Sequence, residues 1–238
     1  MKFTGQPNIF DLNPFEESSV QMHQLGARGE LADGRIFRYG KTGEAIDIGR
    51  VTVSAAIDAT LINCAVTTAA AIGAKEIAFT NAATTATANE YAEGFLGISY
   101  GTGLGQTLKV SSHAALTSGG ASTVYLEDPV QVALNTTSKV ELTHNPYKGV
   151  MMTATSVTFP TGGALRTFTS TYYGWFQTRG VFYAIADGTV TAGYGMMTDA
   201  STAGDVDLVG TATQQYIIGN FIKASASGYF HPVFLKID

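Results

Sequence analysis

The stretch from Tyr172 to Tyr194, YYGWFQTRGVFYAIADGTVTAGY, decides the fold class of this chain. It holds the only tryptophan, Trp175, and an Asp187-Gly188 pair between two apolar runs. Asp-Gly between strand-like runs is a strong hairpin signal, because a type I′ turn needs a positive φ at both central residues. Apolar residues fill both alternating positions of 180–186, a pattern typical of a strand covered on both faces. The stretch therefore predicts a core β-hairpin.

Three side chains of this hairpin have different expected environments. Trp175 and Phe182 are predicted to lie in the core, because both stand in an apolar context. Arg179 is the polar group that we expect at a contact between subunits. The hairpin as a whole therefore indicates architecture rather than a reaction.

The composition favours strands over helices throughout the 238 residues. Only 14% of the residues are charged, whereas Thr, Val, Tyr and Phe are frequent and 27 glycines punctuate the chain. Short alternating segments recur at spacings of roughly ten residues, as in barrels and sandwiches. We expect an all-β or mostly β protein with strands at 35–39, 76–80, 106–112, 124–126, 139–143 and 229–238.

The chain divides into three predicted regions. Residues 1–50 are rich in charge, prolines and glycines and are expected to form an extended N-terminal arm. Residues 51–146 and 147–238 are each predicted to form a small β-barrel or β-sandwich module. Within the first module, the Ala-rich and Thr-rich segment 51–75 gives mixed signals, and we favour extended or mixed structure up to Gly73.

Charge, hydropathy and cysteine usage exclude several classes of function. The net charge is −5 and no basic block occurs, which argues against nucleic-acid binding. No run reaches the roughly 18–20 apolar residues of a membrane span, and no secretory signal is apparent. Cys64 is the only cysteine, so an internal disulfide and a cysteine-based zinc site are both excluded. We expect a soluble protein made in a cytoplasm, with Cys64 as a buried thiol.

The motifs that could carry chemistry lack the necessary context. Gly97-Ile-Ser99-Tyr-Gly101 matches the G-x-S-x-G nucleophile pattern, but glycines follow where a helix is needed. The glycine-rich 101–105 also lacks the third glycine and the helix of a dinucleotide loop. No bound metal, no cofactor and no catalytic residue are expected. Two weaker sources of cation binding are the scattered histidines, His23, His113, His144 and His231, and the loop acids Asp199, Asp205 and Asp207.

Several segments together resemble proteins that decorate the capsids of tailed bacteriophages. The resemblance spans nearly the whole chain in order, and the number and order of the segments carry it. They are QLGARGELADGRIFRY at 24–39, AIGAK at 71–75, ANEYAEG at 88–94, GTGLGQ at 101–106 leading to Ser112-His113, NPYKG at 145–149, YGWFQTRG at 173–180 and VFLKID at 233–238.

The resemblance implies a β-rich decoration, or cement, protein on the outer surface of the capsid. Its partner would be the major capsid protein in its assembled lattice, and the protein would form a homotrimer without catalytic residues. On this view the protein is made in the bacterial host cytoplasm and resides in the virion.

The N-terminal arm is the part that we expect to reach a neighbouring subunit. Its aromatic residues would supply apolar anchors and its arginines polar contacts. The predicted contact residues are Phe10, Phe15, Phe37 and Tyr39 with Arg28, Arg35 and Arg38.

Three alternative functions remain open at this point. The chain has the composition of other phage head, tail or fibre components as well. A carbohydrate-binding module for adsorption would use exposed Trp and Tyr platforms, which the apolar context of Trp175 disfavours. An enzyme is the third alternative, with Ser99 as its nucleophile.

Overall fold

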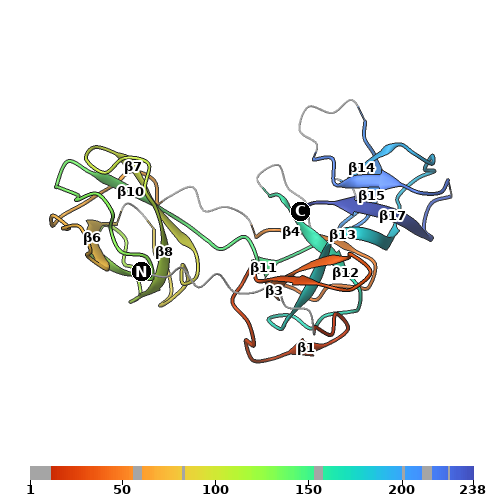
Figure 1. Ribbon diagram of the computed structural model, residues 1–238, viewed down its shortest axis with the longest axis horizontal. Helices are drawn as coiled ribbons and strands as arrows, with labels where there is room; N and C mark the ends of the chain where they lie inside the picture. Colours follow the sequence, from red (N-terminus) through yellow and green to blue (C-terminus); the bar gives the residue numbers. More distant parts are fainter. Residues whose placement is uncertain are drawn as a thin grey trace. The chain divides into compact units, whose positions relative to one another are not determined.

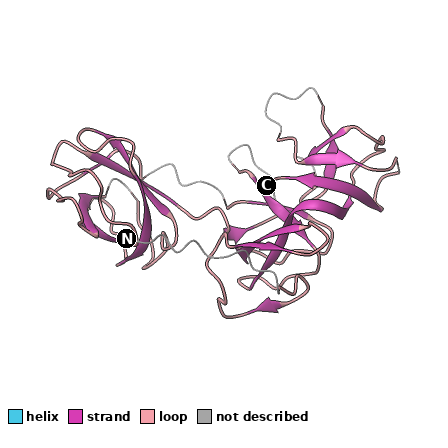
Figure 2. Ribbon diagram, in the orientation of Figure 1, coloured by secondary structure: helices cyan, strands magenta, loops and turns pink. Residues whose placement is uncertain are grey.

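The computed structural model describes residues 12–55, 61–81, 84–152, 158–199, 202–210, 216–224 and 226–238. Every regular element in these ranges is a strand, and none of them forms a helix (Figures 1 and 2). The fold is therefore all-β, as the composition predicts. The chain forms two units, one from 57–145 and one that combines residues up to 56 with 146–238. We call them the barrel unit and the split unit.

The barrel unit is a six-stranded antiparallel sheet in the order β5-β10-β7-β8-β9-β6. A bridge between Val66, next to β5, and Phe79 of β6 joins the two outermost strands, so the sheet is nearly closed into a barrel. The strands are β5 (Cys64–Ala65), β6 (Glu76–Thr80), β7 (Phe95–Tyr100), β8 (Thr107–His113), β9 (Ala121–Leu126) and β10 (Lys139–Thr143).

Alternation of side chains builds the barrel core. In β6, Ile77 and Phe79 are buried while the residues between and beside them are not, and β10 repeats the pattern with Val140 and Leu142. The segments that connect the strands add buried residues such as Leu134. This core draws only on residues of the barrel unit.

The split unit is organised around β13 (Tyr173–Ile185), the strand that holds Trp175. Its first half pairs with β3 and its second half with β17, both antiparallel (Figure 1). The strand order is β11-β3-β13-β17-β16-β14-β15. In addition, β1 and β12 pair with β13, β4 pairs with β12, and β2 pairs with β3. These strands are β1 (Glu17–Ser18), β2 (Arg28–Glu30), β3 (Ile36–Thr42), β4 (Val51–Val53), β11 (Lys148–Val150), β12 (Pro160–Ala164), β14 (Gly195–Thr198), β15 (Val206–Leu208), β16 (Gly219–Phe221) and β17 (Phe230–Lys236).

The strand around Trp175 is present, but the predicted hairpin is wrong. After β13 the chain does not return along it, because the next strand, β14, pairs with β15 and β16. Of the two expected turn residues only Gly188 has a positive φ, 87°, so the type I′ geometry is not formed. The partner of β13 at this end is β17, more than forty positions further along the chain.

The second half of β13 is covered by the core on one face only. Trp175 and Phe182 are each 4% exposed, which confirms them as core residues. Val181 and Tyr183, on the opposite face, are 49% and 57% exposed. The expectation of a strand covered on both faces is therefore wrong for the second half of β13.

The N-terminal region differs from the extended arm that the sequence suggests. From residue 12 onward it forms β1, β2 and β3, and β3 lies between β11 and β13 inside the sheet. The physical reason is that Phe37 and Tyr39 are buried in the core of the split unit beside Trp175. The segment 51–75, whose conformation the sequence left open, contributes β4 to the split unit and β5 to the barrel unit, and its residues 56–60 lie outside the described ranges.

Candidate interaction surfaces

The predicted contact residues separate into buried, exposed and undescribed positions. Phe37 and Tyr39 are 0% and 3% exposed, so they anchor the core of their own unit rather than a neighbouring subunit. Phe15 is 57% exposed and remains available for a contact. Phe10 lies outside the described residues.

The three predicted contact arginines are already paired within the chain. Arg28 contacts Glu30 at 2.8 Å, and Arg35 contacts Asp33 at 2.7 Å. Arg38 on β3 donates from Nε to Asp238 Oδ2 at 2.7 Å and from Nη2 to Oδ1 at 2.9 Å. This bidentate hydrogen bond lowers the pKa of the Asp238 carboxyl, although partial burial opposes the shift. The arginines thus fix local structure.

An aromatic cluster lies where β1 meets β3 and β13. The rings of Tyr39 and Trp175 are 5.2 Å apart, and His23 lies 5.1 Å from Tyr39. A pocket of about 190 Å³ opens beside them, bordered by Leu12 and Glu16. Its volume is below the roughly 300–1,000 Å³ of most ligand sites, and we assign it no ligand.

The split unit has an exposed apolar surface on the outward side of β13, β17 and β16, which we call the outer face. Directly paired residues point to the same side of a sheet, so the register places its side chains in three rows. The rows are Val181, Phe234 and Asn220, then Tyr183, Pro232 and Ile222, then Ile185 and Phe230. Phe182 and Val233, on the opposite side, are buried in the core.

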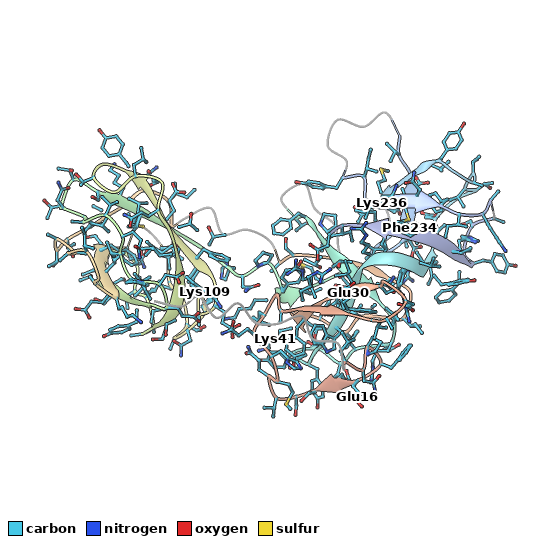
Figure 3. The ribbon with its side chains drawn as sticks, in the orientation of Figure 1. Glu16, Glu30, Lys41, Lys109, Phe234 and Lys236 are labelled. Atoms are coloured by element: carbon cyan, nitrogen blue, oxygen red, sulfur yellow. The ribbon has the colours of Figure 1, made fainter. Side chains whose placement is uncertain are left out.

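Much of the outer face is open to solvent. Val181, Tyr183, Phe230 and Ile222 are between 43% and 57% exposed, and Ile185, Pro232 and Phe234 are half-buried. Large contiguous apolar surfaces of this kind mark interaction sites more often than lone exposed residues do. Figure 3 labels Phe234 and Lys236, which lie on β17 two positions apart.

The two ends of the outer face carry opposite charge. At one end Arg179 of β13 pairs directly across from Lys236 of β17, and both are exposed. No ion pair of Arg179 occurs among the described residues, while Lys236 Nζ donates to Asn220 Oδ1 at 2.7 Å. At the other end lie Asp187, just beyond β13, and Asp207 of β15.

The barrel unit has an exposed apolar surface of its own. The segments 66–75, 101–106 and 127–138 all lie at one end of the barrel, because Glu76 pairs with Tyr125 and Lys139 with Tyr100. We call the exposed large apolar residues of this end the loop-end surface. They are Ile72 (70% exposed), Leu104 (67%), Tyr100 (61%) and Val132 (50%).

Hydrogen bonds hold the loops of this surface in place. Gln106 Nε2 donates to the carbonyls of Gly103 and Val132, and its Oε1 accepts from the Val132 amide at 2.9 Å. The Gly73 amide donates to the Val130 carbonyl at 2.8 Å. The loop-end surface is therefore a fixed part of the barrel, which lowers the entropy lost on binding.

The catalytic and cation-binding candidates of the sequence do not assemble into sites. Ser99 lies on β7 and donates to Asn63 Oδ1 at 3.1 Å, an amide that cannot act as a general base. Asp205 forms an ion pair with Arg50, and Asp199 accepts from the Thr202 amide at 2.6 Å. Within the described ranges no group of three or more His, Cys, Asp or Glu side chains is placed to hold a metal ion.

The histidines and the cysteine have structural environments. His113 is 3% exposed, and its Nε2 accepts from the Tyr91 amide at 2.9 Å. His144 stacks on the Tyr91 ring at 4.1 Å, and His231 Nε2 contacts the Ala226 carbonyl. Cys64 is buried, as expected.

Sequence reasoning missed both surfaces for identifiable reasons. The second half of β13 has apolar residues in both alternating positions, which predicts burial on both sides, so an exposed face was not expected. At the loop end, single apolar residues in glycine-rich turns give no periodic signal. An isolated Leu104 between glycines is the one local indication that a loop carries an outward apolar side chain.

Comparison with known proteins identifies no relative. No family model matches the chain, and neither a curated protein nor a solved structure matches it. Among the residues that the structure describes, no helix is long and apolar enough to cross a membrane.

Proposed function

We propose that this protein decorates and stabilises the capsid of a tailed bacteriophage by binding the assembled lattice of the major capsid protein. The sequence resemblance suggests this role. The observation that carries it is that each of the two units presents an exposed apolar surface, the loop-end surface and the outer face. A protein in which each of two units has a binding surface can bridge neighbouring partners.

Bridging explains how modest surfaces would stabilise a large shell. A protein that binds the assembled lattice but not its free subunits shifts the equilibrium toward the lattice by mass action. Repeated attachment adds avidity to each single contact. On this proposal the loop-end surface makes the capsid contact, because Ile72, Leu104 and Val132 are exposed on the connecting segments and Tyr100 at the end of β7. Gln106 holds the segments of Leu104 and Val132 together.

The test is co-sedimentation of the purified protein with capsids built from the major capsid protein of the same phage. We expect saturable binding to assembled capsids, no binding to the unassembled subunit, and a higher temperature of capsid disruption. Leu104→Ser with Val132→Ser should weaken binding, whereas Ile62→Ser is the matched control, because Ile62 is 47% exposed at the opposite end of the barrel, where Leu61 pairs with Leu142. Equal binding to free and assembled capsid protein would count against the proposal.

Location in the particle separates this function from a role in the tail or fibre. Cryo-electron microscopy of the virion should place many copies on the head lattice. A few copies at the tail would replace the proposal with the alternative of a tail component. For a carbohydrate-binding role, burial of Trp175 at 4% exposed removes the tryptophan platform for a sugar ring.

A further inference from the structure

We propose that the outer face of the split unit packs against the outer face of a second copy of this chain, about a two-fold axis that passes beside Tyr183. This inference concerns self-association and does not depend on capsid binding, and it puts a two-fold dimer in place of the homotrimer that the sequence resemblance implies. It starts from the sheet, which is buried on one side by the core and bears exposed apolar rows on the other. Face-to-face packing of two sheets is the usual way in which such rows are removed from water.

The distribution of charge selects a second copy as the occupant. Arg179 and Lys236 are directly opposed like charges, an arrangement that is unfavourable unless an anionic group lies nearby. Two carboxylates that a second copy could supply are at the other end of the same face, where Asp207 lies within reach of the Gly188 turn next to Asp187. A face with a basic end and an acidic end is complementary to itself when one copy is reversed.

The spacing along β13 fits this reversal. Arg179 precedes Tyr183 by four positions and Asp187 follows it by four. At about 3.3 Å per residue, each charge lies roughly 13 Å from the central tyrosine. A two-fold axis that crosses the strands at Tyr183 therefore brings Arg179 of one copy to Asp187 of the other, twice per dimer. Such an isologous contact closes on itself and forms a dimer.

The apolar rows match under the same operation. The middle row, with Tyr183, Pro232 and Ile222, faces the same row of the second copy. The outer rows exchange, so that Val181 and Phe234 of one copy lie over Ile185 and Phe230 of the other. Aromatic residues at the centre with charged residues at the rim is the common arrangement of stable interfaces.

The test is sedimentation equilibrium of the full chain over a range of concentrations. We expect a monomer–dimer equilibrium for the unmodified protein. Tyr183→Lys places two ammonium groups together at the axis and should abolish the dimer, although the fold persists because Tyr183 is 57% exposed. Arg179→Asp and Asp187→Arg should each weaken dimerisation by roughly tenfold or more, and the double swap should restore it.

Matched controls make the result decisive. Lys139→Asp changes an exposed charge on the barrel unit and should leave the dimer unchanged. Asp187→Asn keeps an acceptor for the Thr202 hydroxyl, which Asp187 accepts at 3.1 Å, and tests the charge alone. Trp175 fluorescence checks that each variant is folded. A monomer at all concentrations, a trimer, or a dimer that Tyr183→Lys leaves intact would each overturn the inference.

Discussion

Gly219 lies at a point in the sheet where a side chain has no room. A Cβ at this position of β16 would stand 2.1 Å from the carbonyl oxygen of Phe234 on β17. Because that oxygen belongs to the backbone, Gly219→Ala should lower the free energy of unfolding by about 2–3 kcal/mol. Gly97 of β7 is the control, since nothing lies within 4 Å of its Cβ position and Gly97→Ala should change stability by less than about 0.5 kcal/mol. Denaturant titrations followed by circular dichroism measure both, and equal effects would contradict the packing described.

The ion pair between Arg38 and Asp238 predicts a pH-dependent contribution to stability. The pKa of Asp238 is lowered by the hydrogen bond from Arg38, so the folded state holds the ionised carboxylate more firmly than the unfolded state does. The contribution is therefore present above the usual Asp pKa of about 4 and is lost as the pH falls through the lowered value. Asp238→Asn should cost about 0.5–1 kcal/mol at pH 7, discounted for partial exposure, and less as the pH falls toward 2.

Unfolding curves at both pH values decide this point. Asp33→Asn is a useful comparison, because the Asp33 carboxyl also has a lowered pKa, set first by the Arg35 amide, but lies in an exposed turn. Its removal should have the smaller effect at pH 7. A loss for Asp238→Asn that is the same at pH 2 and pH 7 would mean that charge is not its cause.

At the scale of a single element, β3 distinguishes a core strand from a binding arm. Phe37 of β3 is fully buried, so Phe37→Ala should lower the free energy of unfolding by about 3–5 kcal/mol. Phe15, exposed before β1, should tolerate Phe15→Ala within about 0.5 kcal/mol. Trp175 fluorescence follows both variants. A stable Phe37→Ala protein that fails only in binding would restore the arm hypothesis.

The strands that the sequence predicts best are those with one covered face. The alternation at 76–80 and 139–143 matches β6 and β10 residue for residue, because each strand buries one side in the barrel. The turn after β13 differs from the predicted hairpin, because Asp187-Gly188 satisfies a local rule while β17 pairs with the edge of β13 that the hairpin needs. A local turn preference stabilises the chain less than a pairing of seven residues whose strands also pack on the core.

The interaction surfaces are harder to predict from the sequence than the strands are. Phe37 and Tyr39 have the aromatic character of interface anchors, and only the pairing of β3 with β13 reveals that they are buried. Conversely, Val181 and Tyr183 have the character of core residues and are exposed. Residue type alone does not separate a core from an interface, since both are built from the same apolar side chains.

At the scale of the whole molecule, the division into units follows long-range pairing. β4 pairs with β12 and β3 with β13, so the barrel unit is an insertion between two halves of the split unit. The sequence predicts that the first β-module begins after residue 50 and ends at residue 146. The barrel unit begins after residue 56 and ends at residue 145. The changes of composition along the chain mark where the barrel begins and ends, but they carry no signal that its flanks join each other.

Separate cores predict separate responses to core substitutions. Every buried cluster of the described residues draws on one unit only. Leu96→Ala, in the barrel core, should remove about 2–5 kcal/mol from the barrel unit, and Val233→Ala a smaller amount from the split unit. Trp175 is the only tryptophan, so its fluorescence follows the split unit, whereas far-UV circular dichroism follows both. We expect Leu96→Ala to shift a circular dichroism transition and leave the Trp175 midpoint in place, and Val233→Ala to shift that midpoint. If Leu96→Ala moved the Trp175 midpoint equally, the two units would unfold as one cooperative body despite their separate cores.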